Sequence, residues 1–463
     1  MESDAQRNTY GRFTMQMSRP SLSQLLRAGE VVYAIVALFA LTQGPVYRLW
    51  SESGMYQQFI PLPTVGHAHF ATFCVIQLPA LIAVSRRLNT ALLRDPRGQA
   101  LLALMLWLGF SVMWSTFARQ SLPEFVSLFF TTSFGIFLAS NFSLRAFWRI
   151  IVTAMSSGLA LSLFAIQRGW GGAVNAEQNY WIGIYFNRNS LAPVAAVAVI
   201  SVAGIICTRQ RNRGLRRSLQ MVSYVVVMAI AVLTLWQAKS QTSPFAILVA
   251  CLALLSWLGI RFGTKNRWTK ISENSAGIAA ALVAIVVLLS LRVVGGISVL
   301  GGETATFNSR ESLWNLSWSG FLVKPLHGWG WLAAWRTISF FQQGEWWAVW
   351  DTEWSHSGYH DLLLGGGVVA AALFAAVVWF GMRAINCHVS LREAIPSFLI
   401  VAFVLAAATQ ESFFIGTHFL WALLIAGLFT FGHLESDADT ASVEKQDSGN
   451  IAPRPSECRT HLN

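Results

Sequence analysis

The sequence predicts an all-α, polytopic transmembrane bundle of about twelve helices, and three observations lead to this class. Hydrophobic residues make up 54% of the chain and charged residues only 12%, about half the charge of an ordinary soluble domain. The mean hydropathy is positive, at +0.49. Apolar runs such as Ala276–Val294 are long enough to cross a hydrocarbon core, where backbone groups must be bonded within a helix.

The apolar runs divide the chain into candidate spans separated by short polar loops. The expected spans are Val31–Leu49, Ala68–Ser85, Gln99–Phe117, Pro123–Asn141, Phe147–Ile166, Leu191–Cys207, Leu219–Ala238, Ser243–Ile260, Ala276–Val294, Leu362–Met382, Ile395–Ala408 and Phe413–Gly432. Residues 1–30 are expected to form a cytoplasmic tail, 31–294 the first nine spans, 295–361 a long extracytoplasmic loop with short helices, 362–432 the last three spans, and 433–463 a disordered cytoplasmic tail. The acidic, polar composition of that last segment is typical of a solvated chain end.

The orientation of the bundle follows from its basic residues. Roughly 24 of the 33 lysines and arginines fall in the tails and in alternate loops, on one side of the expected bundle. The side rich in basic residues is cytoplasmic by the positive-inside rule, so both termini are expected inside and the loop 295–361 outside. The net charge of +11 is therefore an orientation signal, and we do not expect a nucleic-acid partner.

Two other classes of protein are disfavoured by the sequence. The five cysteines lie mostly within or beside apolar runs and show no metal-ligand spacing, which argues against a disulfide framework or a zinc site. The basic N-terminal segment lacks a compact apolar core followed by a cleavage site, so we expect it to be retained and not removed as a signal peptide.

The long loop contains nine of the 20 tryptophans, between Trp314 and Trp354. A loop of this length is expected to fold and to have a function. Tryptophan is enriched at membrane interfaces, which favours an anchoring role for most of these residues. The alternative is that their aromatic faces stack on sugar rings or cover a lipid-phosphate site.

A helix is predicted within this loop, from Asn308 to about Lys324. Asn308 and Glu311 have the spacing of a capping box, and Pro325 follows the end. Arg310 then lies in the first turn, where a cation is unfavourable unless an anion is near. Amides at a helix start together with a guanidinium are suited to bind phosphate; the alternative is a structural ion pair with Glu311 or another loop acid.

A second polar segment, residues 353–361, directly precedes an apolar span. His356 in this position is suited to accept a proton near neutral pH. His356 and His360 are four residues apart and would share a helix face, so that a metal site with Glu353 or Asp361 is a minority interpretation. The remaining alternative is a hydrogen-bonded histidine without a chemical role.

Three further polar positions lie on the side with few basic residues. Arg188 precedes one span and Lys239 lies in a short hairpin between two others. Cations there do not serve orientation, so both are candidates for binding an anionic substrate, although Lys239 has the alternative of extending from a helix end to the interface. Gln410 and Glu411 form an outward polar pair whose acid would orient a histidine or arginine, or merely end a helix.

These segments, in this order, resemble the superfamily of O-antigen ligases and of O-antigen and exopolysaccharide polymerases. The matching stretches are 185–192 (Tyr-Phe-Asn-Arg-Asn-Ser-Leu-Ala), 240–242 (Ser-Gln-Thr), 309–314 (Ser-Arg-Glu-Ser-Leu-Trp), 325–330 (Pro-Leu-His-Gly-Trp-Gly) and 356–359 (His-Ser-Gly-Tyr). Each motif alone is weak, whereas their order and the large outer loop before the tenth span together are fairly specific.

The resemblance implies a metal-independent membrane glycosyltransferase without a cofactor. Such enzymes move a glycan from a polyprenyl-diphosphate carrier, typically undecaprenyl diphosphate, to a lipid or glycan acceptor at the outer face of the bacterial inner membrane. Arg310 matches the arginine that holds the diphosphate, and His356 matches the histidine proposed to activate the acceptor hydroxyl. Other polysaccharide-assembly proteins are further candidate partners. The residues expected to bind substrate are Arg188, Asn189, Lys239, Gln241, Glu353 and Trp354.

The chain departs from the family pattern at two positions. The hairpin arginine of the family is replaced by Gln241, with Lys239 two residues before it, and lysine lacks the two-pronged geometry of arginine. His356 is followed by Ser357 where asparagine is common in the family. The sequence does not distinguish a ligase from a polymerase and does not identify the sugar. It also leaves open whether Lys239 replaces the missing arginine.

Two other functions compete with the transferase. A transporter or flippase for a lipid-linked glycan would need polar groups at the middle of the bilayer and broken helices, whereas here polarity gathers at the outer edge. A structural or receptor-like membrane protein would make the outward arginine and histidine a coincidence.

Overall fold

The computed structural model describes residues 21–46, 65–87, 93–208, 215–263, 307–337, 354–387, 390–414 and 416–430. The helices that run along the bundle are α1 (Leu22–Leu41), α3 (Val65–Arg87), α5 (Pro96–Phe110), α6 (Ala118–Asn141), α7 (Leu144–Gln167), α8 (Arg188–Cys207), α9 (Leu215–Ala238), α10 (Thr242–Gly263), α14 (Gly358–Cys387), α15 (Leu391–Ala407) and α16 (Phe419–Phe429). Smaller elements are the 3-10 helix η1 (Ser111–Trp114), helices α12 (Phe307–Val323) and α13 (Ala334–Thr337), and the antiparallel pair β1 (Val174–Asn175) and β2 (Tyr180–Trp181).

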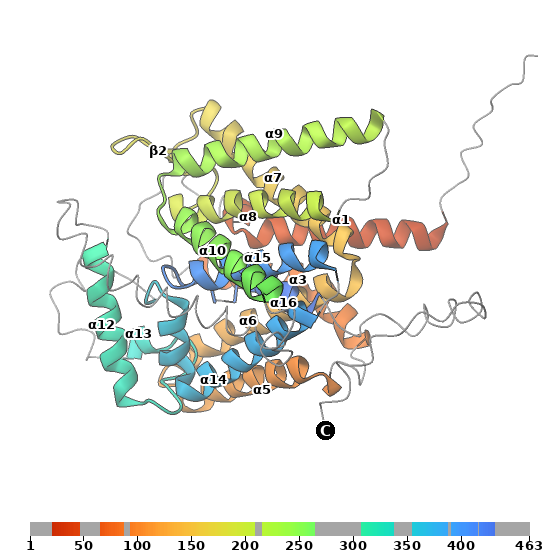
Figure 1. Ribbon diagram of the computed structural model, residues 1–463. Coiled ribbons are helices and arrows are strands. Elements are labelled where there is room, and N and C mark those ends of the chain that lie inside the picture. The colour runs from red at the N-terminus through yellow and green to blue at the C-terminus, as the bar shows by residue number, and fades with distance from the viewer. Residues whose placement is uncertain are drawn as a thin grey trace, which may run out of the picture.

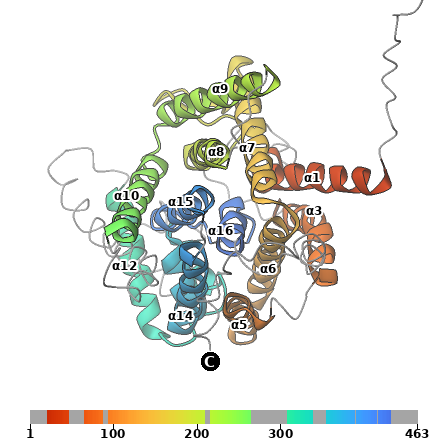
Figure 2. The ribbon, with the colours of Figure 1, turned by 45° about the vertical axis from the view of Figure 1, so that its right-hand side comes forward.

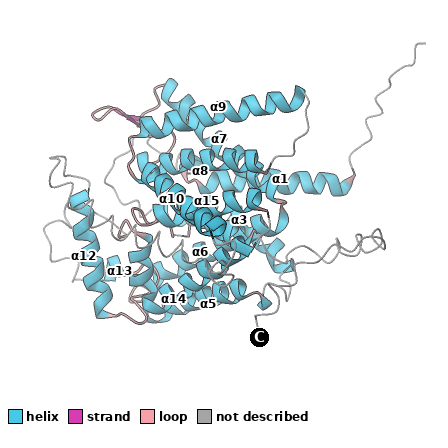
Figure 3. Ribbon diagram, in the orientation of Figure 1, coloured by secondary structure: helices cyan, strands magenta, loops and turns pink. Residues whose placement is uncertain are grey.

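The helices form a bundle whose most buried members lie at its centre. Figure 2 shows α15 and α16 surrounded by the other helices, and Figure 3 shows that almost all the described chain is helical. Every residue of α16 is buried, whereas α9 lies at the periphery with many apolar side chains exposed, including Trp236 at 80%. Exposed apolar side chains on the outside of a bundle are what lipid requires.

In the described part of the chain, eight helices are long and apolar enough to cross a membrane. The polytopic helical class is therefore confirmed, while the number twelve is not. The predicted span Ala276–Val294 lies outside the described residues, and each of the other predicted spans overlaps a described helix. Helices α3, α15 and α16 correspond to predicted spans but are not among the eight.

Two predicted boundaries differ from the structure for identifiable reasons. The first helix begins at Leu22, nine residues before the expected Val31, because Ser21 and Gln24 form a capping box that starts the helix there. The last predicted span, Phe413–Gly432, contains only the 11-residue α16. Its first part is instead a turn region, and His418 caps the helix by accepting a hydrogen bond from Leu420 N–H.

Basic side chains join helix ends at one end of the bundle. Arg97 Nη1 donates to Leu428 O at 3.1 Å, Arg145 Nε to Thr208 O at 3.0 Å, and Arg261 Nη1 to Asn386 O at 3.1 Å. The accepting carbonyls lie at the C-terminal ends of α16, α8 and α14. The N-terminal ends of these helices lie together by residues 408–418, so all three bonds lie at the same, opposite end of the bundle. The structure thus groups these basic loop residues as the orientation argument expects.

The opposite end carries α12, α13 and the β1–β2 hairpin, and α12 runs across this end and not along the bundle (Figure 1). We call this end of the bundle, which carries α12, α13 and the β1–β2 hairpin, the polar end. The predicted helix Asn308 to about Lys324 is confirmed as α12, although it begins at Phe307, so that Asn308 lies inside the first turn and not at the cap.

Helix α14 is broken near this end. Gly367 has φ +67°, and the chain on both sides of it pairs with residues 325–330 in place of helical partners. Trp329 N–H donates to Leu364 O at 2.7 Å, and Val368 N–H donates to Pro325 O at 2.8 Å. The Pro-Leu-His-Gly-Trp-Gly segment therefore satisfies backbone groups that the break in α14 would otherwise leave unpaired.

Candidate functional site

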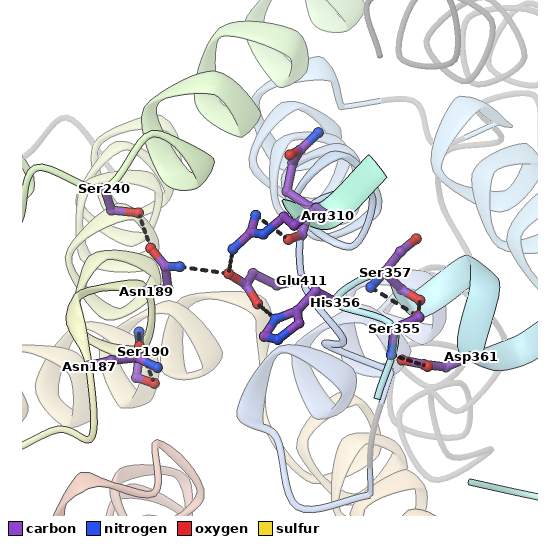
Figure 4. Close-up of polar contacts among 11 residues, drawn as sticks. Asn187, Asn189, Ser190, Ser240, Arg310, Ser355, His356, Ser357, Asp361 and Glu411 are labelled. Atoms are coloured by element: carbon purple, nitrogen blue, oxygen red, sulfur yellow. Dashed lines mark hydrogen bonds and ion pairs between the residues drawn. The ribbon is translucent and has the colours of Figure 1, made fainter. Parts of the chain in front are cut away.

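The candidate site is centred on the carboxylate of Glu411 at the polar end (Figure 4). Its Oε1 accepts hydrogen bonds from Arg310 Nη2 at 2.6 Å and from Asn189 Nδ2 at 2.7 Å. Its Oε2 lies 3.0 Å from His356 Nδ1. One acid thus joins residues that are 222, 101 and 55 positions away along the chain.

Arg310 reaches Glu411 from the first turn of α12. Its Nη1 donates to the backbone carbonyl of Gln410 at 2.8 Å, so the guanidinium contacts two consecutive residues of the segment between α15 and α16. The described contacts use two of the five N–H donors of an arginine. The ion pair expected as an alternative does form, and its acid is Glu411; the side chain of Glu311 lies outside the described residues.

His356 is presented by a tight turn before α14. Its φ is +53°, a left-handed conformation that histidine adopts more readily than most residues. Asp361 in the first turn of α14 accepts a hydrogen bond from Ser355 N–H at 2.9 Å, and Gly358 N–H donates to Ala408 O at 2.8 Å. These bonds fix the turn from both sides, so the imidazole is held against Glu411.

Asn189 lies in the first turn of α8, which begins behind the cap residue Asn187. While its amide N–H donates to Glu411, its Oδ1 accepts from Ser240 Oγ at 2.9 Å. Ser240 belongs to the hairpin between α9 and α10, where Lys239 turns the chain with φ +49°. The polar chain from Ser240 through Asn189 therefore connects a second hairpin to the central acid.

The charges of the site set the protonation of Glu411. Burial raises the pKa of this carboxyl group, but the Arg310 charge and the His356 hydrogen bond outweigh it, and the pKa falls to about 2. Glu411 is thus ionised at neutral pH. An ionised carboxylate only accepts hydrogen bonds, so His356 Nδ1 carries a proton, and in the neutral imidazole Nε2 is then the basic nitrogen.

This arrangement has the parts of an acid-base site with an anion-binding group beside it. An imidazole oriented by a carboxylate through Nδ1 is suited to accept a proton from a hydroxyl at Nε2. A guanidinium that contacts the same carboxylate is suited to bind phosphate oxygens. The side chains of Arg310 and His356 are 16% and 22% exposed, so a substrate can reach them.

The other predicted substrate-binding residues have different surroundings. The guanidinium of Arg188 lies 4.8 Å from the Tyr180 ring centroid, over its face. Lys239 is exposed and its Nζ donates to Gln178 O at 3.1 Å. Neither has a described contact with Glu411.

Three more predicted residues complete the set. Gln241 is exposed at the start of α10. Trp354 is 36% exposed beside Ser355, and Glu353 lies outside the described residues. The structure therefore brings together Arg310, His356 and Asn189 of the predicted residues.

The tryptophans of the outer loop differ in burial, so a single role does not account for all of them. Trp331 and Trp335 are buried within the protein, so neither interfacial anchoring nor sugar stacking describes them. Trp318 is 49% exposed, in keeping with anchoring. Trp314 stacks on the His360 ring at 6.0 Å, and Trp346, Trp347 and Trp350 lie outside the described residues.

The two histidines of the expected metal site do not lie together on one helix face. His356 precedes α14 and does not share a helix face with His360, whose ring instead packs on Trp314. Among the residues that the structure describes, no three His, Cys, Asp or Glu side chains are placed to hold a metal ion.

One site residue, Glu411, and one residue near it, His418, are not assigned to the site by the sequence. The sequence marks Glu411 as an acid suited to orient a histidine or arginine, but no pattern in the sequence shows that Arg310, His356 and Asn189 are its partners. His418 was missed; its burial lowers its pKa to about 3 even though the Glu411 charge opposes this, so it is neutral at physiological pH. A polar residue directly before a strongly apolar run was the signal for a helix cap there.

The fold and site define a polytopic helical membrane protein with an arginine–glutamate–histidine cluster at one end of its bundle. Residues 238–375 match the model of a family described as O-antigen ligase. The resemblance stated from the sequence is thus confirmed over this stretch, which is similar to the O-antigen ligase family. Arg310 and His356 lie within it, whereas Asn189 and Glu411 lie outside. The chain has no significant match among curated proteins.

Proposed function

We propose that this protein is a membrane glycosyltransferase that moves a glycan from a polyprenyl-diphosphate carrier to a lipid or glycan acceptor. The single observation that carries the proposal is the carboxylate of Glu411, which contacts Arg310 at 2.6 Å and His356 at 3.0 Å. The two kinds of group that such a transfer needs, a cation for the leaving diphosphate and a base for the acceptor hydroxyl, are therefore adjacent.

In the proposed reaction, His356 Nε2 takes the proton of the acceptor hydroxyl as its oxygen attacks the anomeric carbon of the donor. The bond from that carbon to the diphosphate oxygen breaks, and the electron pair leaves with the polyprenyl diphosphate. Arg310 stabilises the negative charge that develops on this leaving group. The positive charge formed on His356 is stabilised by Glu411.

The cellular setting belongs to the same proposal. We place the reaction at the outer face of the bacterial inner membrane in surface polysaccharide biosynthesis, with both termini cytoplasmic and no metal ion required. The grouping of Arg97, Arg145 and Arg261 at the end opposite the site supports this orientation.

The first prediction concerns Arg310 and His356. In a deletion strain, variants Arg310→Ala and His356→Ala are expected to lose at least about a hundredfold of glycan transfer while reaching the membrane at normal levels. Asn315→Ala, on the exposed face of α12, is the matched control and should keep full activity. Surface polysaccharide and lipid-linked glycan are sized on gels.

The outcomes separate the competing functions. Donor accumulating at the outer face supports a transferase, whereas donor accumulating at the cytoplasmic face would indicate a flippase. Full transfer by either variant would remove that residue from the mechanism. Short units still attached to their acceptor would identify a polymerase, and full-length chains stranded on the carrier a ligase.

A further inference from the structure

The reaction proposed above assigns no role to Asn189, but the hydrogen bonds of this residue indicate that it has one. We infer that Asn189, supported by Ser240, is a positioning residue that holds Glu411 against His356 while Arg310 binds the donor diphosphate. This inference rests on the proposed function, because it concerns the same site. It differs from the role expected from the sequence, in which Asn189 binds substrate directly.

The orientation of the Asn189 amide is determined by its two partners. Its nitrogen lies 2.7 Å from Glu411 Oε1 and its oxygen 2.9 Å from Ser240 Oγ. Exchanging the two amide atoms would place the carbonyl oxygen against an ionised carboxylate, which repels it. The Ser240 hydroxyl donates to the oxygen and so stabilises the orientation in which the N–H faces Glu411 (Figure 4).

The charge balance of the site explains why Glu411 needs an uncharged hydrogen-bond donor besides Arg310. Without substrate, Arg310 and Glu411 neutralise each other at 2.6 Å. A diphosphate brings further negative charge to the same guanidinium, and its oxygens compete with Glu411 Oε1 for Nη2. The carboxylate would then be repelled by the phosphate and drawn less strongly by the arginine.

The hydrogen bond from Asn189 to Glu411 is not affected when phosphate oxygens compete for Arg310. This hydrogen bond to Oε1 comes from α8, whereas Arg310 comes from α12. The start of α8 also presents the positive end of a helix dipole, which favours a carboxylate close to it. Glu411 therefore keeps a donor on Oε1, and its Oε2 keeps the His356 Nδ1 proton in place, when Arg310 turns to phosphate.

The inference predicts a change in turnover and not in donor binding. Asn189→Ala is expected to lower kcat of glycan transfer about ten- to a hundredfold, the cost of a misplaced catalytic group, with the donor KM changed less than about twofold. Asn189→Asp keeps the size but places a carboxylate beside Glu411, and should lower kcat further. Ser240→Ala, a milder change, should lower kcat by a smaller factor.

The experiment uses the full-length protein in nanodiscs, with lipid-linked glycan extracted from the deletion strain as donor and undecaprenyl diphosphate as the binding probe. Arg310→Ala is expected to weaken binding of the probe about tenfold or more, whereas Asn189→Ala and Ser240→Ala leave it unchanged. The matched control Asn315→Asp, exposed on α12 at the same end, should match the wild type in every measurement.

A double variant tests whether Asn189 acts through Glu411. Once Glu411→Gln has removed the carboxylate, adding Asn189→Ala should cost less than about twofold more in kcat, because residues of one network are not additive. Full additivity, a raised donor KM, or weaker probe binding in Asn189→Ala would overturn the positioning role and favour direct substrate contact. Unchanged kcat in both Asn189→Ala and Ser240→Ala would also overturn it.

Failure of the proposed function has a different signature. If the wild-type protein neither binds undecaprenyl diphosphate nor transfers glycan, the transferase proposal fails and this inference fails with it. If Arg310→Ala and His356→Ala abolish transfer while the Asn189 and Ser240 variants behave like the wild type, only the inference fails.

Discussion

The carboxylate of Glu411 is shared between a permanent cation, a titratable imidazole and a neutral amide, so its charge state determines the geometry of all three. An acid placed this way would be destabilising if it lost all of its partners, because a buried charge without partners is costly. Its pKa of about 2 expresses how strongly Arg310 and His356 favour the ionised form over the effect of burial. Stability and chemistry therefore depend on the same contacts.

The second prediction is a pH dependence of stability that originates at Glu411. Its pKa is lowered from 4.5 to about 2 on folding, so its contribution is complete above the unfolded value and is lost as the pH falls from about 4.5 through about 2. Thermal unfolding of wild type and Glu411→Gln in detergent measures this. The wild type should be the more stable at neutral pH, and the difference should shrink toward pH 2. A difference that is constant across this range would contradict the assignment.

At the scale of elements, the break in α14 connects the fold to the site. The carbonyls of Leu364 and Gly365 accept from Trp329 and Gly330 and not from the next turn of the helix. This pairing joins the segment after α12 to the segment that presents His356. The two elements that carry Arg310 and His356 are therefore tied by backbone bonds close to the site.

The third prediction tests this junction at Gly328. Its φ is +67°, and a Cβ there would lie 2.5 Å from Leu364 O, so Gly328→Ala meets both a strained backbone and a steric clash. We expect a cost of about 2 kcal/mol or more, seen as a fall of a few degrees in apparent Tm, together with loss of transfer. Gly259→Ala in α10 is the control, since nothing apart from its own helix backbone lies within 4 Å of its Cβ position. A stable Gly328→Ala protein would show that the junction tolerates rearrangement.

Elements with a long, uniform signal could be predicted from the sequence, while those shaped by tertiary contacts could not. The spans at α6 to α10 were located because each is a long apolar run with polar ends. The sequence predicts the start of α1 too late, because its first turns mix polar residues with leucines and depend on the Ser21 cap. The break at Gly367 has no local sequence signal beyond three consecutive glycines, since its cause is pairing with residues 325–330.

The charged and titratable residues of the site could be predicted from the sequence, whereas the contacts between them could not. Arg310 and His356 were identified because they carry charge or a titratable ring at the outer edge of a bundle. That Glu411 joins them depends on α15 and α16 lying at the centre of the bundle, which no spacing along the chain encodes. For the same reason Lys239 and Arg188, equally good candidates by sequence, contact Gln178 and Tyr180 instead.

At the scale of the whole molecule, the two ends of the bundle differ in kind. One end has arginines that bond to helix ends, such as Arg145 and Arg261. The other end has α12 and the hairpin (Figure 1), together with the Glu411 cluster (Figure 4). Positive charge follows the cytoplasmic side, and a lipid-linked donor at the outer face requires the cluster on the opposite side. The proposed function therefore requires one orientation of the bundle and excludes the other.

The fourth prediction tests that orientation directly. Gln178 at the tip of the hairpin and Arg86 near the end of α3 are both exposed, so single cysteines at these positions, in a variant lacking the native cysteines, can react with a membrane-impermeant maleimide. In intact spheroplasts Gln178→Cys should be labelled and Arg86→Cys should not, and permeabilisation should make both react. The reverse pattern would place Arg310 and His356 in the cytosol, where a diphosphate-linked glycan already moved to the outer face cannot reach them. A transferase acting there would need a donor still on the cytoplasmic leaflet, so this result would refute the proposed reaction whatever the activities of the site variants.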